Sequence, residues 1–259
     1  MVGFKRGEAS ITIDPQNGAR MTSLTIGDLQ LLTPRQESIF HWGSFPMIPW
    51  VGRIRNGVFS HKGKQHQLPL NMPPHSIHGT TYDRAWQQTD PAGDFEISLG
   101  ENWPFAGRAV QRFRLNPNSL EQTLEIHSDG ESFPASCGWH PWFERQLARG
   151  EEAELKFQAE SMYHRDEEYI ADGPLIQPGP SPWDDCFKGV KQPVEIIWPG
   201  ALKLILESDT DHWVVYNMPE HAFCVEPQTG PPDALNLAPN LVTPNKPLIA
   251  RTWWRWELL

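Results

Sequence analysis

The sequence predicts an all-β protein with few short helices, and three observations lead to that class. The 25 prolines make up about a tenth of the 259 residues, roughly twice the average share. Proline interrupts helix interiors but is tolerated in turns and edge strands. Short segments of alternating apolar and polar residues recur between turn residues, and no long segment combines helical periodicity with caps. Many short antiparallel strands joined by turns indicate a sandwich or a barrel.

The predicted strands follow one another along the chain as hairpins. Two hairpins have two-residue loops, with strands at 24–26 and 29–31 around Gly27-Asp28 and at 58–61 and 64–68 around Lys62-Gly63. In a third hairpin, one strand ends at Leu115 and the next begins near Leu120, after the turn Asn116-Pro117-Asn118. The alternation returns at 202–207 and at 254–258. Strands of this kind are expected to be half buried, with one face on the core.

Composition excludes several classes of protein. The formal charge of −10 argues against nucleic acid and anionic membranes as partners. No apolar run approaches the ~18 residues of a membrane-spanning helix, and the first ten residues lack the apolar region of a signal peptide. The three cysteines are far apart and suggest neither a disulfide framework nor a zinc knuckle. We therefore expect a single cytoplasmic domain that covers residues 1–259.

Long segments rich in Pro, Gly, Asn and His are the places where a functional site is expected. These segments, which are predicted to be irregular, cover 34–57, 69–92, 133–145, 171–192 and 227–247. The 12 tryptophans are unusually many for this length. Most of them are expected to fill the core, although the flat indole ring also stacks well on sugar rings.

Three polar clusters in these segments contain basic or titratable candidates. Arg53 lies between glycines in Gly52–Gly57, where its guanidinium could present a planar set of donors to a hydroxyl or a carboxylate. His75 and His78 are three residues apart but lack further ligands at zinc spacing, so no metal site is predicted. His140 stands between two tryptophans, where burial would favour the neutral imidazole and place its pKa near the working pH.

Two further clusters supply carboxylates. Asp184 and Asp185 are flanked by aromatic residues, and alone this pattern is typical of a turn. Glu226 follows an apolar, strand-like stretch at the start of a loop stiffened by prolines, which makes it a candidate general base. Taken singly, each of these residues is also compatible with an ordinary structural role.

Taken in chain order, the clusters resemble the aldose 1-epimerases, the galactose-mutarotase-like enzymes. From about Phe45 to Asn236 the shared motifs are Gly-Arg-Ile, an apolar residue before His-Gly, Gly-Trp-His-Pro-Trp-Phe, Trp-Asp-x-x-Phe and Glu-Pro-Gln-Thr-Gly-Pro-Pro-Asp-Ala-x-Asn. The His-Pro-aromatic-Phe and Glu-Pro-Gln-Thr motifs are the most specific. The resemblance implies a large antiparallel β-supersandwich of the galactose mutarotase type, with an open concave face that binds a pyranose.

The resemblance also implies roles for individual side chains. Glu226 matches the catalytic base and His140 matches the catalytic acid. The residues that match those holding the sugar hydroxyls and the ring oxygen are Arg53, His78 and Asp184. Gln228, in the same motif as Glu226, and Trp142 are further substrate-binding candidates.

The implied reaction interconverts the α and β anomers of a hexopyranose and needs no cofactor. Glu226 takes the proton of the anomeric hydroxyl while His140 protonates the ring oxygen, and the C1–O5 bond opens to the free aldehyde. Rotation about C1–C2, followed by the reverse proton transfers, closes the opposite anomer. The cycle starts from an ionised Glu and a protonated His, whose ordinary pKa values of about 4.3 and 6.5 bracket a suitable pH range. Arg53 could stabilise negative charge that develops on oxygen.

Departures from the family pattern bear on substrate choice. The first His-Gly is followed by Thr80–Trp86, Trp142 replaces the tyrosine of the family's His-Pro-Tyr-Phe, and Glu144 stands where asparagine is common. Trp86 and Trp142 are therefore either sugar platforms or core residues. The arginines available to hold an acidic substituent are Arg55, Arg84 and Arg108. The arginine-containing segment of the branch that acts on hexose 6-phosphates is absent, which favours a neutral or differently charged sugar.

Three functions remain in competition at this point. The first is an aldose 1-epimerase for free hexoses, and the second is an epimerase for an acidic sugar such as a hexose 6-phosphate or a sulfonated hexose. The third is a non-catalytic carbohydrate-binding protein on the same fold. The presence of both Glu226 and His140 argues against the third, because a pure binder needs no acid–base pair. The expected partner is a small sugar, and the protein is expected to be a monomer or a homodimer.

Overall fold

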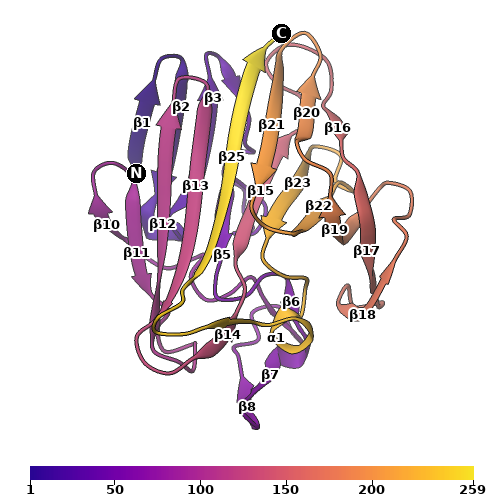
Figure 1. The fold of residues 1–259 in the computed structure, drawn as a ribbon. Helices are drawn as coiled ribbons and strands as arrows, with labels where there is room; N and C mark the ends of the chain where they lie inside the picture. Colours follow the sequence, from indigo (N-terminus) through magenta and orange to yellow (C-terminus); the bar gives the residue numbers. More distant parts are fainter.

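The structure, a computed structural model, describes all of residues 1–259 as two large antiparallel sheets with very little helix (Figure 1). The first sheet has 11 strands, in the spatial order β1 (Val2–Arg6), β2 (Ala9–Asp14), β3 (Arg20–Ile26), β5 (Ser44–Met47), β15 (Gly138–Glu144), β23 (Ala222–Gln228), β22 (His212–Tyr216), β19 (Asp184–Val190), β17 (Ala159–Arg165) and β18 (Ala171–Ile176), with β4 (Leu29–Gln30) beside β3. The second has eight strands, in the order β10 (Gln87–Asp90), β11 (Asp94–Ser98), β12 (Gly107–Asn116), β13 (Ser119–Ser128), β25 (Leu248–Leu258), β21 (Leu202–Ser208), β20 (Val194–Trp198) and β16 (Glu154–Lys156).

Smaller elements connect and cover the sheets. Three two-stranded sheets are formed by β14 (Phe133–Ala135) with β24 (Asn240–Val242), β6 (Arg53–Ile54) with β9 (Ser76–Ile77), and β7 (Val58–His61) with β8 (Lys64–Gln67). The helical segments are η1 (Pro15–Asn17), η2 (Arg55–Gly57) and α1 (Ala234–Leu237). None of these helices has the length and apolar character needed to cross a bilayer.

The all-β class and the three predicted hairpins are confirmed. Across the three turns, Ile26 pairs with Leu29, His61 with Lys64, and Asn116 with Ser119. The alternating segments at 202–207 and 254–258 lie in β21 and β25. The hairpins were identified by a turn sequence together with a period of two, and the segments at 202–207 and 254–258 by the period of two alone.

The expectation that 34–57, 133–145 and 171–192 are irregular is wrong in part. These segments contain β5, β15 and β19, which belong to the first sheet. In β15 the first six residues are all buried, because one face packs on the core and the other lies under loops. Burial on both faces removes the alternation by which a half-buried strand is recognised, and Pro141 further obscures the pattern.

The two large sheets pack face to face around a core of 47 buried residues. Phe143 of β15 contacts Trp254 of β25 across the sheets, with ring centroids 5.3 Å apart. Most tryptophans fill this core as expected, namely Trp50, Trp86, Trp103, Trp139, Trp198, Trp213, Trp254 and Trp256. Trp86 is therefore a core residue, and its Nε1 donates to the carbonyl of Thr81 at 3.0 Å.

The pleat of the first sheet divides its central side chains between the core and the opposite face. On β15, Trp139 and Phe143 belong to the core, while His140 and Trp142 lie on the other face. On β23 the core residues are Phe223 and Val225, and Glu226 lies on the face with His140. This outer face, covered by the loops before and after β6 and β9, carries the candidate site.

Candidate active site

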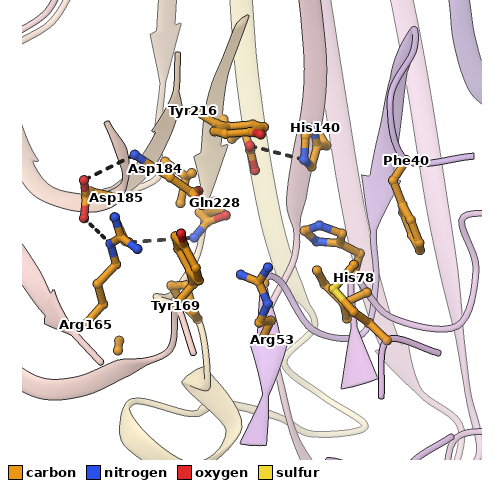
Figure 2. Close-up of a pocket in the computed structure, with 18 of the residues that line it drawn as sticks. Phe40, Arg53, His78, His140, Arg165, Tyr169, Asp184, Asp185, Tyr216 and Gln228 are labelled. Carbon is orange, nitrogen blue, oxygen red and sulfur yellow. Dashed lines mark hydrogen bonds and ion pairs between the residues drawn. The ribbon is translucent and has the colours of Figure 1, made fainter. Parts of the chain in front are cut away.

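All seven side chains expected to form a site line one pocket on the outer face of the first sheet (Figure 2). They are Arg53, His78, His140, Trp142, Asp184, Glu226 and Gln228. The cavity has a volume of about 180 Å³. It brings together residues that are more than 170 positions apart in the sequence, because β15, β23, β22 and β19 are neighbours in the sheet and the segments of β6 and β9 bring Arg53 and His78 to the same pocket.

His140 and Glu226 form the centre of the pocket. They lie on adjacent antiparallel strands, and Nε2 of His140 is 3.4 Å from Oε1 of Glu226. Phe45 and Trp142 stack against the imidazole, with centroid distances of 4.8 and 5.5 Å and interplanar angles of 17° and 18°. Both members of the pair are almost fully buried, with 6% of His140 and 3% of Glu226 exposed. The aromatic contacts fix the ring plane so that its Nε2 faces the carboxyl group.

Burial drives both members of this pair towards their neutral forms. Desolvation lowers the pKa of His140 well below 6.5, and the nearby charges of His78 and Arg20 lower it further. Desolvation raises the pKa of Glu226 well above 4.5, and the charge of Asp184 adds to the rise. The neutral imidazole was expected, but the expectation of a pKa near the working pH is wrong. The expectation that ordinary pKa values hold Glu226 ionised beside a protonated His140 is also wrong for this geometry.

His78 lies directly beside the central pair. Its ring meets that of His140 edge to face, with centroids 5.0 Å apart and an angle of 89°. Burial lowers the pKa of His78 to about 3, and the charge of Arg53 acts in the same direction. The backbone of His78 has φ 58°, and its buried Nδ1 has no hydrogen-bond partner. A neutral imidazole with a free nitrogen at the pocket can bond to a hydroxyl group.

Arginines and aspartates on the other side of the pocket balance one another. Burial raises the pKa of Asp184, while the charges of Arg53 and Arg165 oppose that rise. Asp185 accepts a hydrogen bond from Nε of Arg165 at 2.6 Å. Two guanidinium groups thus face two carboxyl groups in the same cavity. Arg53 itself is placed there by the pairing of β6 with β9, where it is opposite Ile77.

Gln228 and Trp142 complete the expected set. Nε2 of Gln228 donates to the carbonyl of Gly230 at 2.8 Å, and its buried Oε1 has no partner. That oxygen is an acceptor available at the pocket. Trp142 is only 3% exposed, and its Nε1 donates to the carbonyl of Phe40 at 2.6 Å. Its ring mainly supports His140 and offers little surface to a ligand.

Several pocket residues were not singled out from the sequence. Tyr163, Arg165 and Tyr169 come from β17 and the turn that joins it to β18, and Phe40 and Tyr216 come from other segments. The available signal was the spacing of Tyr163 and Arg165, two positions apart on one strand face. The arginines considered for an acidic substituent, Arg55, Arg84 and Arg108, do not line the pocket.

One group of side chains has the donor atoms to hold a cation. The imidazole of His140, the thiol of Cys224 and the carboxyl group of Glu226 offer ligand atoms that all lie within 4.8 Å of one another. Nitrogen, sulfur and oxygen donors in this combination suit zinc. Two of the three are the central acid–base pair, so a cation bound there would occupy the atoms available for proton transfer.

The two-sheet antiparallel fold is that of the galactose mutarotase-like proteins. The chain belongs to the aldose 1-epimerase family, whose sequence profile matches residues 4–250. A galactose mutarotase-like protein from Clostridium acetobutylicum has a TM-score of 0.87 at 16% identity, with 99% of this chain and 95% of that chain covered. Galactose 1-epimerase from Lactobacillus acidophilus NCFM has a TM-score of 0.81 at 17% identity, with 98% and 93% covered.

Two relatives from Escherichia coli K12 match part of the sequence. The uncharacterized protein YphB is 30% identical over 104 residues, which are 38% of this chain and 36% of YphB. The uncharacterized protein YihR is 27% identical over 164 residues, which are 58% of this chain and 52% of YihR. The aligned part thus spans between a third and about half of these relatives' own length.

Proposed function

We propose that this protein is an aldose 1-epimerase that acts on a free, uncharged hexopyranose, with Glu226 as the base and His140 as the acid. The observation that carries the proposal is the 3.4 Å approach of His140 Nε2 and Glu226 Oε1 on the wall of one small pocket. Hydroxyl-binding groups from His78, Arg53 and Gln228 surround this pair. Membership of the aldose 1-epimerase family supports the reaction type.

The protons of the reaction balance within the pair. When Glu226 accepts the anomeric proton and His140 protonates the ring oxygen, an ionised carboxylate and an imidazolium become a carboxylic acid and a neutral imidazole. Burial favours this neutral form of both groups. Relative to the charged pair, the site therefore stabilises the protonation state that accompanies the open-chain aldehyde. Ring closure reverses both transfers: Glu226 returns its proton to the carbonyl oxygen and His140 takes the proton of the O5 hydroxyl, so the charged form is restored without exchange with solvent.

The size and charge of the pocket support a single neutral sugar as substrate. A cavity of about 180 Å³ is smaller than the roughly 300–1,000 Å³ typical of sites for drug-sized ligands. Arg53 and Arg165 are matched by Asp184 and Asp185, so the pocket has no excess of cationic groups for a phosphate or sulfonate. These features favour a free hexose over the acidic sugars, which remain the alternative substrates.

The test is anomer exchange measured by NMR on a panel of glucose, galactose, glucose 6-phosphate and a sulfonated hexose. We expect faster α/β exchange for a neutral hexose with the wild-type protein. Glu226→Gln should reduce the acceleration by about 10²–10⁴, the usual contribution of a general base. Arg108→Ala, which changes a residue far from the pocket, should retain it.

Other outcomes of the same experiment would change the conclusion. A turnover of glucose 6-phosphate or of the sulfonated hexose at least tenfold better than that of the free sugars would replace the neutral substrate by an acidic one. Chemical shift changes in the protein on sugar addition, without acceleration for any sugar, would indicate a non-catalytic carbohydrate-binding protein.

A further inference from the structure

We propose that Tyr169 is a specificity-determining residue that forms one wall of the sugar pocket, and that Arg55 is the positioning residue that holds it there. The inference rests on the proposed function, because it takes the ligand of the pocket to be a sugar. It concerns the hairpin formed by β17 and β18, whose turn carries Tyr169.

Tyr169 is fixed in the pocket by cationic neighbours on two sides (Figure 2). The guanidinium carbon of Arg165 lies 4.3 Å from the centroid of its ring, and that of Arg53 lies 5.4 Å away. Arg165 also bonds to the Tyr169 side chain and is itself anchored by Asp185 at 2.6 Å. The ring is therefore a rigid surface at the pocket, and 40% of the residue remains exposed. An aromatic face of this kind can pack against the apolar face of a sugar ring.

The backbone of Tyr169 supports a functional origin for this position. Its φ is 61°, in the left-handed region that a bulky side chain rarely adopts. Strain of this kind persists where the surroundings enforce it, and it is concentrated at functional sites. His78, which also lines the pocket, has the same kind of conformation with φ 58°. Glycine or asparagine would fit the turn at Tyr169 with less strain, yet neither would supply the aromatic wall.

Charged contacts attach the tip of the hairpin to the short segment that follows β6. Arg55 pairs with Asp166 and with Glu168, the latter at 2.7 Å. Nε2 of His75 lies 3.4 Å from Glu168, while its Nδ1 accepts from the backbone N–H of Asn56 at 3.1 Å. These groups link the turn just before Tyr169 to the body of the protein.

Within the turn itself, backbone contacts carry this constraint to Tyr169. Asp166 Oδ1 accepts from the backbone N–H groups of Glu168 at 2.9 Å and of Ile170 at 3.2 Å, so residues 166–170 move as a unit. The Arg55 segment is in turn tied to the loop after Glu226, because its backbone N–H donates to Asp233 Oδ1 at 3.3 Å. Arg53 and Arg55, two positions apart, thus contact the ring and the tip of the same hairpin. Loss of the tip contacts would release Tyr169 from the pocket without moving His140 or Glu226.

The experiment compares three substitutions with a matched control. Tyr169→Asn removes the ring but tolerates the backbone conformation, and we expect KM to rise about tenfold with little change in kcat. The same variant should have a higher midpoint of denaturant unfolding, because strain is relieved. Tyr169→Phe keeps the wall and should keep KM within about twofold of the wild-type value.

Arg55→Ala tests the positioning role. It should raise KM about threefold and speed hydrogen exchange of the amides of residues 166–170, as high salt should do in the wild-type protein. Arg108→Ala is the control, since Arg108 also pairs with two carboxylates, Glu96 and Asp129, and has a similar side-chain exposure of 39% against 36% for Arg55. It should change neither KM nor the exchange of this turn.

Specific results would overturn each part. An unchanged KM in Tyr169→Asn would show that Tyr169 does not form a wall of the sugar site. Unchanged hydrogen exchange of residues 166–170 in Arg55→Ala would show that Arg55 does not position this turn. If the wild-type protein does not accelerate epimerisation, the proposed function fails separately. The role of Tyr169 is then tested by calorimetry, which compares the sugar affinity of the wild-type protein with that of Tyr169→Asn. Absence of any sugar binding would reject both proposals.

Discussion

His140 and Glu226 face each other at 3.4 Å in a setting that lowers the pKa of the imidazole and raises that of the carboxyl group. Each shift opposes the order in which the free side chains titrate. Both shifts favour the arrangement in which the carboxyl group, and not the imidazole, holds the proton. Ring opening puts one proton of the sugar on Glu226 and moves one from His140 to the ring oxygen, and ring closure reverses both transfers.

The first prediction concerns the protonation of His140. At about pH 5.5 an ordinary histidine is mostly protonated, since its pKa is near 6.5, whereas His140 should be neutral. Nitrogen chemical shifts of the imidazole, recorded by heteronuclear NMR, distinguish the two forms. The urea-unfolded chain at the same pH provides the reference for an unshifted histidine. Imidazolium shifts for His140 in the folded protein would contradict the argument from burial.

The second prediction follows from the pKa of His78, which burial lowers to about 3. Below pH ~6.5 the unfolded chain binds a proton at this residue and the folded protein does not. Stability therefore falls as the pH is lowered from 6.5 towards 3, by about 1.4 kcal/mol per pH unit for this residue. His78→Asn, which tolerates positive φ, should lose about 2–3 kcal/mol less than wild type between pH 7 and pH 4.5. Denaturant unfolding at both values measures the difference, and equal losses would refute the assignment.

The third prediction concerns the glycine that follows His78. Gly79 has φ 84°, and a Cβ there would lie 1.8 Å from the carbonyl oxygen of Ile48. Gly79→Ala should therefore destabilise the protein by more than about 4 kcal/mol or prevent folding. Gly63→Ala is the control, because Gly63 has a similar φ of 76° but nothing within 4 Å of its Cβ position. The control should cost only about 1–2 kcal/mol for the backbone strain, and similar losses in the two variants would contradict the steric argument.

The fourth prediction concerns metal ions. The proposed proton transfers use only Glu226 and His140, so removal of metals with a chelator should leave epimerisation unchanged. Added zinc should inhibit, because the donors of His140, Cys224 and Glu226 lie within 4.8 Å of one another. Cys224→Ser should weaken this inhibition while the chelator restores activity to the wild type. Loss of activity on chelation alone would show that a metal takes part in the reaction.

The sequence identified those parts of the fold in which local chemistry determines structure. The hairpin at Gly27-Asp28 was recognisable because its turn residues and its alternating strands agree. The strand that carries His140 was not, because it is buried on both faces and contains a proline. Its place beside β23 and β5 depends on contacts between distant segments, which no local pattern encodes.

In the candidate site, too, some residues could be identified from local sequence patterns and others depend on contacts between distant segments. The motifs around His140 and Glu226 are specific enough to identify, and the side chains expected with them do line one pocket. Tyr169 was missed because its turn, seen alone, is a charged and exposed segment. Only the fold places that turn between Arg53 and Arg55, more than 110 positions earlier in the chain. Residues that enter a site through such long-range packing leave little signal in a single sequence.

The position of β25 has a consequence for how the chain reaches this structure during synthesis. This strand, Leu248–Leu258, lies in the middle of the eight-stranded sheet and pairs with β13 on one side and β21 on the other. Until it has left the ribosome, the two halves of that sheet have no partner at their inner edges. The eight-stranded sheet therefore cannot close before β25 has been translated, and until then the nascent chain exposes the inner edges of two half-sheets to association with other proteins.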